Sequence, residues 1–165
     1  MKSMFEFIVK LICKLRYTIK LVYFKCVYNN RISLGEGVFF RDKFKVILEE
    51  NAVLRIGNSC FFNNYCSINC LGEITIGDYC IFGENVKMYD HNHMYSNLYK
   101  RILNQGFSIG KITIGNNCWI GSNVTILNNV DIGDNVVIGA NCLIYKSIPS
   151  NSVVKNNSEL LISNK

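Results

Sequence analysis

Isoleucine recurs at every sixth position through the second half of the chain, at Ile114, Ile120, Ile126, Ile132, Ile138 and Ile144. Four residues after each isoleucine comes a small or β-branched residue, in the series Cys118, Val124, Val130, Val136, Cys142 and Ile148. A period of six fits neither a helix nor a strand, and short fixed repeats are typical of solenoids. We therefore predict a coil of three flat faces with one hexapeptide per face. The isoleucines would point inward, and Gly or Asn-Asn pairs would form the corners, where positive φ is needed.

The same repeat extends toward the N-terminus with irregular spacing. Spacings of eight, as from Leu48 to Ile56 and from Ile68 to Ile76, predict two-residue insertions at corners. The hexads stop after Met88 and resume at about residue 112, so residues 94–111 are predicted to be a loop extruded from one corner. Insertions into repeat folds often lie on the binding face. We expect an all-β solenoid over residues 32–154 and a polar tail over residues 155–165.

Residues 1–31 carry a helical pattern in place of the hexads. Apolar side chains recur there at steps of three and four and share one face: Phe5, Ile8, Ile12, Leu15, Ile19, Val22, Tyr23 and Cys26. Seven basic residues against one acid give this segment a net charge of +6, while the remaining residues are balanced at eleven of each sign. Two readings of this basic amphipathic helix stay open. It could cap the open end of the solenoid, or it could lie on an anionic membrane surface.

Composition and charge argue against several other kinds of protein and site. We expect no nucleic-acid partner, because the basic residues are confined to one predicted helix. No apolar run reaches the roughly 20 residues that span a bilayer, and the start of the chain has no clean apolar segment with a cleavage site, so we expect no signal peptide. Five of the eight cysteines fall four residues after an aliphatic or aromatic repeat residue: Cys60, Cys66, Cys80, Cys118 and Cys142. Cysteine behaves there as a small hydrophobe, which predicts reduced core cysteines in a cytosolic protein. Without a CxxC pair, a zinc site is a weak alternative, and we predict no metal.

Both histidines of the chain lie in the segment Asp90-His91-Asn92-His93, at the single break in the strict repeat. Histidine is the natural general base near neutral pH. The alternative is a pair of ordinary polar loop residues. Their position at the base of the extruded loop favours a functional role.

Several segments resemble those of the hexapeptide-repeat acyltransferases, namely FFNNYCSI, ITIGDYCIFGENV, DHNH, ITIGNNCWIGSNVTIL and VVIGANCLIYKSIPSNSVV. The resemblance covers about residues 48–154 and is closest to galactoside and maltose acetyltransferases and to the capsule and lipopolysaccharide O-acetyltransferases. It implies a left-handed parallel β-helix, acetyl-CoA as co-substrate, and a homotrimer with the active site between neighbouring subunits.

Position by position, the resemblance implies that His93 is the catalytic base, with His91 and Asp90 in support. Asn63 matches a residue of the acceptor pocket. The residues that match cofactor contacts are Trp119, Ser122, Ala140 and Lys146. The family's closing Gly-x-Pro-Ala-Lys stretch is replaced here by residues 155–159, so contacts to the nucleotide end of CoA are not assigned.

These residues predict an acetyl-CoA-dependent O-acetyltransferase acting on a sugar hydroxyl, in capsule or lipopolysaccharide biosynthesis. His93 would remove the hydroxyl proton during direct transfer. The alternatives are N-acetylation of an amino sugar or nucleotide-linked sugar, a serine-type acetyltransferase, and a non-enzymatic scaffold. A hexapeptide-repeat carbonic anhydrase needs three histidines, and this chain has two. We expect a cytoplasmic protein, with a possible peripheral position at the inner face of the membrane.

Overall fold

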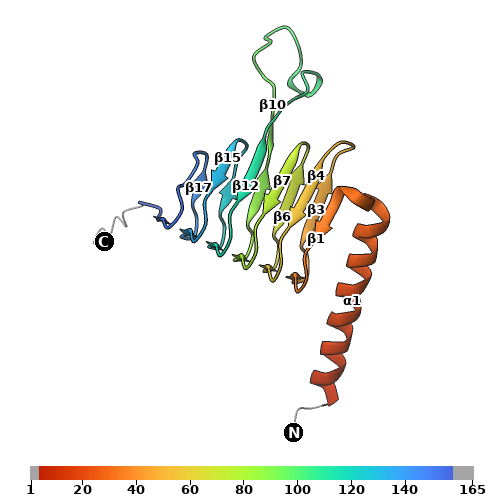
Figure 1. Ribbon diagram of the computed structural model, residues 1–165. Coiled ribbons are helices and arrows are strands. Elements are labelled where there is room, and N and C mark those ends of the chain that lie inside the picture. The colour runs from red at the N-terminus through yellow and green to blue at the C-terminus, as the bar shows by residue number, and fades with distance from the viewer. Residues whose placement is uncertain (1–3, 158–165) are drawn as a thin grey trace, which may run out of the picture.

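The computed structural model describes residues 4–157 and shows a parallel solenoid of about six turns, a left-handed β-helix, with one helix at its N-terminal end (Figure 1). Three parallel sheets form its faces. The first face contains β1 (Ile32–Leu34), β4 (Val53–Ile56), β7 (Glu73–Ile76), β12 (Lys111–Ile114) and β15 (Val130–Ile132). The second contains β2 (Phe39–Phe40), β5 (Phe61–Phe62), β8 (Ile81–Phe82), β13 (Trp119–Ile120), β16 (Val137–Ile138) and β18 (Val153–Val154). The third contains β3 (Lys45–Leu48), β6 (Ser67–Cys70), β9 (Lys87–Tyr89), β14 (Thr125–Ile126) and β17 (Leu143–Ile144). The predicted fold class is therefore confirmed.

The inward residues of each coil stack on those of the next. Ile112 pairs with Ile74 on one side and with Val130 on the other, and all three are buried. On the second face, the inward column is aromatic toward the N-terminal end, and the rings of Phe62 and Phe82 stack with centroids 4.4 Å apart. The five cysteines predicted to point inward are buried and free, as expected. The residue at each inward position therefore sets the width of the coil.

At the corners the prediction is confirmed for the asparagines and wrong for the glycines. Positive φ is taken mainly by asparagine, as at Asn117 (54°) and Asn123 (60°), and not by the glycine of the Ile-Gly pairs. Those glycines are needed because the next coil passes too close for a Cβ. A Cβ on Gly121 would lie 2.7 Å from the backbone nitrogen of Ala140. The asparagines also donate to one another from coil to coil, from Asn85 to Asn123 at 2.9 Å and from Asn123 to Asn141 at 3.1 Å.

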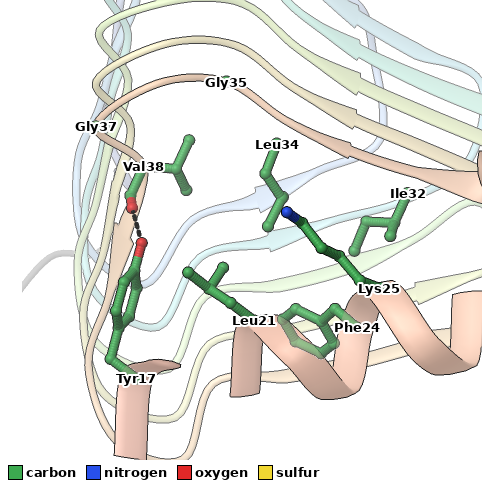
Figure 2. Close-up of a pocket in the computed structure, with 9 residues that line it drawn as sticks. All are labelled: Tyr17, Leu21, Phe24, Lys25, Ile32, Leu34, Gly35, Gly37 and Val38. Atoms are coloured by element: carbon green, nitrogen blue, oxygen red, sulfur yellow. Dashed lines mark hydrogen bonds between the residues drawn. The ribbon is translucent and has the colours of Figure 1, made fainter. Parts of the chain in front are cut away.

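Helix α1 (Met4–Tyr28), followed by the 3₁₀ turn η1 (Asn29–Arg31), crosses the open end of the first coil (Figure 1). Its side chains donate to backbone carbonyls on the unpaired edge of that coil, Lys20 to Phe44 at 2.9 Å and Tyr28 to Val46 at 2.9 Å. An unpaired sheet edge carries carbonyls that need partners. Figure 2 shows Tyr17, Leu21 and Phe24 of α1 facing the coil across a small pocket of about 190 Å³. The helix therefore caps the solenoid.

The face of α1 that does this is not the predicted one. The residues that pack on the solenoid are Tyr17, Lys20, Leu21, Phe24 and Tyr28. The predicted apolar face is exposed, with Ile12 at 49% and Leu15 at 58% of full exposure. The prediction was wrong on this point because the helix has two apolar faces. The shorter of them, which contains the tyrosines, packs against the edge of the coil. Figure 1 shows the N-terminal part of α1 running past the edge of the solenoid.

Candidate active site

The extruded segment is an antiparallel hairpin that leaves the corner between the third and first faces, after β9 (Figure 1). Its strands are β10 (His91–His93) and β11 (Phe107–Ile109), and the short 3₁₀ turn η2 (Ile102–Asn104) lies near its tip. The excursion therefore begins three residues before the predicted start at residue 94, and both histidines belong to its first strand. Asn92 donates to Asn128 in the corner of the next coil at 3.1 Å, which ties the hairpin to the solenoid.

Asp90 anchors the base of the hairpin. Its side chain is fully buried, and it is the only buried polar or charged residue among those the structure describes. Its carboxylate accepts from the backbone N–H of Leu71 at 2.9 Å, from that of Gly72 at 2.8 Å, and from the Cys70 thiol at 3.1 Å. Burial and the neighbouring carboxylate raise the pKa of the Cys70 thiol, so it stays protonated and can donate. Buried charge is tolerated where donors satisfy it in this way.

His91 is the fourth group on this carboxylate, with its Nδ1 3.0 Å from Oδ1 of Asp90. Because a carboxylate can only accept, the Nδ1 atom carries the proton of this bond, and Nε2 is left as the remaining acceptor of a neutral ring. The side chain of His91 is only 15% exposed. The arrangement fixes the orientation of His91.

His93 lies two residues further along β10 and is exposed. Its ring contacts the ring of Phe107 on β11, with centroids 4.4 Å apart, and Phe107 also meets His91 edge-on at 5.4 Å. Within residues 4–157 no side chain or backbone group hydrogen-bonds the His93 ring. His93 is therefore held by packing alone, with both ring nitrogens open to a substrate.

Phe107 is a residue of this site that the sequence reasoning missed. It lies where no hexad repeats, and the only signal was its place two residues before Ile109 at the return of the loop. The cross-strand register makes it the direct partner of His93. The tip of the hairpin orders itself, because the Gln105 side chain bonds the backbone of Asn97 and Lys100 at 2.9 to 3.0 Å.

The other predicted site residues gather elsewhere. Asn63, Ser122 and Ala140 lie at the corner between the second and third faces. Ser122 and Ala140 are on successive coils, whereas the coil that carries Glu84 separates Asn63 from Ser122, and Ser122 accepts from the backbone of Glu84 at 3.2 Å. Trp119 is nearby on β13, where its ring points outward and is 54% exposed. This corner is separated from the hairpin by the whole width of the third face.

Lys146 follows β17 at the same edge of the third face as the hairpin. Its ammonium lies 5.6 Å from the centroid of the Tyr145 ring. Within one chain the predicted site residues thus form two half-sites. The hairpin half contains Asp90, His91 and His93, joined by Phe107, with Lys146 beyond it, and the corner half contains Asn63, Trp119, Ser122 and Ala140.

Metal and thiol chemistry find little support in this arrangement. Over residues 4–157 no three His, Cys, Asp or Glu side chains converge as a metal site would require. Buried thiols such as Cys66 donate to backbone carbonyls, here that of Gly83 at 3.1 Å, and burial raises the pKa of Cys66 to about 11. A protonated, buried thiol is a poor nucleophile.

Comparisons with known proteins agree with the fold and the repeat. Residues 111–146 match the family described as bacterial transferase hexapeptide (six repeats). The chain is 28% identical over 132 residues to the Escherichia coli protein named as a colanic acid biosynthesis acetyltransferase, WcaF, covering 79% of this chain and 68% of that one.

Two solved structures are also similar. A hexapeptide-repeat acetyltransferase of Vibrio cholerae, complexed with acetyl-CoA, has a TM-score of 0.64 and 26% identity, covering 73% of this chain and 63% of that one. A galactoside acetyltransferase in complex with CoA has a TM-score of 0.63 and 35% identity, covering 73% of this chain and 58% of that one. The chain thus spans less than two thirds of either structure. On its repeat, its coil and these likenesses, it belongs to the hexapeptide-repeat acyltransferase family.

Proposed function

We propose that the protein is an acetyl-CoA-dependent O-acetyltransferase acting on a sugar hydroxyl in surface polysaccharide biosynthesis, with His93 as general base. The observation that carries this proposal is the hairpin: it interrupts a strict repeat, carries both histidines, and leaves one imidazole open beside an aromatic ring. The solved relatives with acetyl-CoA or CoA bound support the co-substrate, and the likeness to WcaF supports the polysaccharide acceptor. We place the enzyme in the cytoplasm, where acetyl-CoA is made.

The chemistry requires one proton to move twice. A sugar hydroxyl is too weakly acidic to attack a thioester unaided, so His93 takes its proton as the oxygen attacks the acetyl carbonyl. The tetrahedral intermediate then expels the CoA thiolate, and the imidazolium returns the proton to that sulfur. General base catalysis of this kind contributes about 10² to 10⁴-fold. We propose direct transfer without an acyl-enzyme, because the buried thiols do not face the hairpin's open ring.

We further propose that the active site forms between subunits of a homotrimer. The hairpin half and the corner half lie at opposite edges of the third face, too far apart to act on one substrate within a chain. A neighbouring copy can bring its corner half, with Trp119, against this chain's hairpin. The exposed tip of the hairpin fits this view, since Leu98 and Leu103 are 92% and 82% exposed.

The second face offers a surface for such a contact. Its outward positions are in register across all six strands and are all apolar: Phe39, Phe61, Ile81, Trp119, Val137 and Val153. The matching ladder on the first face is polar, with Ser33, Arg55, Thr75, Thr113 and Asp131. An apolar stripe that runs the length of a molecule marks an interaction surface. We assign this stripe to the contact between subunits.

The base is tested by replacing each histidine alone. His93→Ala should lower transfer of acetyl groups from acetyl-CoA by about 10² to 10⁴-fold, read as thiol release with a panel of sugar acceptors, while the far-ultraviolet dichroism stays unchanged. His91→Ala should lose less, because His91 supports the hairpin without taking the proton. Full activity of His93→Ala alongside an inactive His91→Ala would overturn the assignment and make His91 the base.

The acceptor panel also separates the nearest rival function. Amine acceptors use the same base, so the panel includes amino sugars and nucleotide-linked amino sugars alongside neutral sugars. We expect ester products with hydroxyl acceptors. An amide product formed faster than any ester would replace O-acetylation by N-acetylation at the same site. Tyr95, Tyr99, Lys100 and Arg101 on the exposed hairpin tip are our candidates for acceptor contacts.

A further inference from the structure

The outward side of α1 carries a continuous apolar face that the solenoid leaves uncovered. The residues that dock α1 recur at Tyr17, Leu21, Phe24 and Tyr28. At about 100° per residue, the exposed apolar residues Ile8, Ile12, Leu15, Ile19, Val22 and Cys26 lie on the opposite side of the helix. Soluble proteins rarely leave such a contiguous apolar face in water. This face runs along most of the helix.

Positive charge lies beside and opposite that face: by the same helical geometry Arg16 and Lys25 flank it, whereas Lys10 and Lys14 lie on the polar side of the helix. Along α1 there are five basic residues, Lys10, Lys14, Arg16, Lys20 and Lys25, and one acid, Glu6. Lys20 is turned into the edge of the coil, and Arg16 pairs with Asp42 at 2.9 Å, whereas Lys10 and Lys14 are exposed on the part of the helix that overhangs the solenoid. These lysines leave the apolar face itself uncharged, as in helices that lie in the surface of an anionic bilayer. An anionic surface would pair with them.

The shape of the molecule favours a flat partner. Because α1 crosses the end of the stack of coils, its outward face also forms the end of the whole molecule (Figure 1). No helix within residues 4–157 has the length and apolarity that crossing a bilayer requires. We infer that α1 lies in the surface of an anionic lipid bilayer, with its apolar face toward the acyl chains and the solenoid standing away from the membrane. This inference does not depend on the acyl-transfer proposal.

Binding of the full-length protein to vesicles tests the inference. We expect it to sediment with phosphatidylcholine vesicles that contain phosphatidylglycerol, to bind pure phosphatidylcholine vesicles at least about tenfold more weakly, and to be partly released by salt. Changing Lys10 and Lys14 together to Gln should weaken binding to the anionic vesicles about tenfold or more. Equal binding to both vesicle types would overturn the inference.

The apolar face is tested by three substitutions with a matched control. Ile12→Ser, Leu15→Ser and Ile19→Ser together should weaken vesicle binding about tenfold or more. The control changes three exposed apolar residues to Ser outside α1, the hairpin and the apolar stripe of the second face: Tyr65, Tyr79 and Leu143. Equal loss in both variants would overturn the inference. The oligomeric state without vesicles is a second check. If the wild type were an oligomer and only the α1 variant were a monomer, a second copy would cover this face and the inference would be overturned.

Two cysteines give a readout of orientation that does not depend on affinity. Cys13 and Cys26 are the exposed cysteines among those the structure describes. By helical geometry Cys26 lies on the outward apolar face, and Cys13 lies beside the docking face. An environment-sensitive dye on Cys26, in a Cys13→Ser variant, should shift to the blue with anionic vesicles, and a dye on Cys13, in a Cys26→Ser variant, should shift far less. Equal shifts, or a larger one at Cys13, would contradict the proposed orientation.

Discussion

Asp90 links the solenoid to the hairpin that carries the proposed base, and its removal should be costly. Asp90→Ala leaves two backbone N–H groups and the Nδ1 of His91 without their acceptor inside a dry corner. We expect unfolding in urea to become easier by about 2–4 kcal/mol, with a fall in transfer rate as the hairpin loses its anchor. The exposed Asp131, which lies on the first face, is the control, and Asp131→Ala should stay within about 0.5 kcal/mol of wild type. Wild-type stability in Asp90→Ala would show that the anchor is dispensable.

The cysteines should divide into two reactive and six silent thiols. Cys13 and Cys26 are exposed on α1, whereas the other six are buried. Burial also raises the pKa of Cys66 to about 11, so at pH 8 it is protonated as well as inaccessible. A disulfide-exchange reagent should therefore release two equivalents from the native protein and eight after denaturation. A third fast equivalent would show that one inward position opens readily.

The six-residue period identified the solenoid, because an inward residue on each face of a regular coil leaves a signature in the sequence. The period did not show that glycine and asparagine have different roles at each corner. Gly121 and Asn123 occupy the same turn. Glycine is needed at residue 121 because the next coil leaves no room for a Cβ, whereas Asn123 adopts positive φ. Both residue types favour turns, so composition alone cannot distinguish close approach from backbone conformation.

The contribution of the positive φ at an asparagine corner can be measured. Asn123 has a φ of 60°, receives a bond from Asn85 and donates one to Asn141. Asn123→Gly keeps the conformation and loses the ladder, whereas Asn123→Ala loses both. We expect Asn123→Ala to unfold more easily than Asn123→Gly by about 1 kcal/mol. Thermal unfolding of the two variants side by side gives the comparison. If the two variants unfolded equally easily, the positive φ of residue 123 would not govern the stability of the corner.

The helix and the hairpin show where a local pattern stops being informative. The spacing of apolar residues predicted α1 but assigned its docking to the wrong face, because Tyr17 and Tyr28 bind the coil edge through their hydroxyl groups as well as their rings. The break in the repeat located the hairpin, but Phe107 could be paired with His93 only once the strand register was known. Helix docking and strand register both depend on contacts between residues that are far apart in the sequence. The local spacing of apolar residues does not reveal such contacts.

In the proposed trimer, the apolar stripe on the second face and the outward face of α1 would act together on a membrane. The stripe runs along the stack of coils, so neighbours that bury its whole length must have parallel axes. A closed ring of three such copies places all three α1 helices at the same end. Three helices on one membrane surface bind with far greater avidity than one, without any new contact.

Breaking the stripe should therefore weaken membrane binding from a distance. Ile81→Asp with Val153→Asp places charge at two exposed positions of the stripe, neither of which is in a proposed half-site. We expect monomers by light scattering, loss of acetyl transfer because the half-sites no longer meet, and anionic-vesicle affinity reduced at least about tenfold although α1 is unchanged. The control, Ser33→Asp with Thr75→Asp, places the same two charges on the polar first face, on either side of Arg55, and should leave all three readouts near wild type. A monomeric variant that binds vesicles as tightly as wild type would mean that each helix acts alone. A variant that remains trimeric would mean that the subunits meet on a different face.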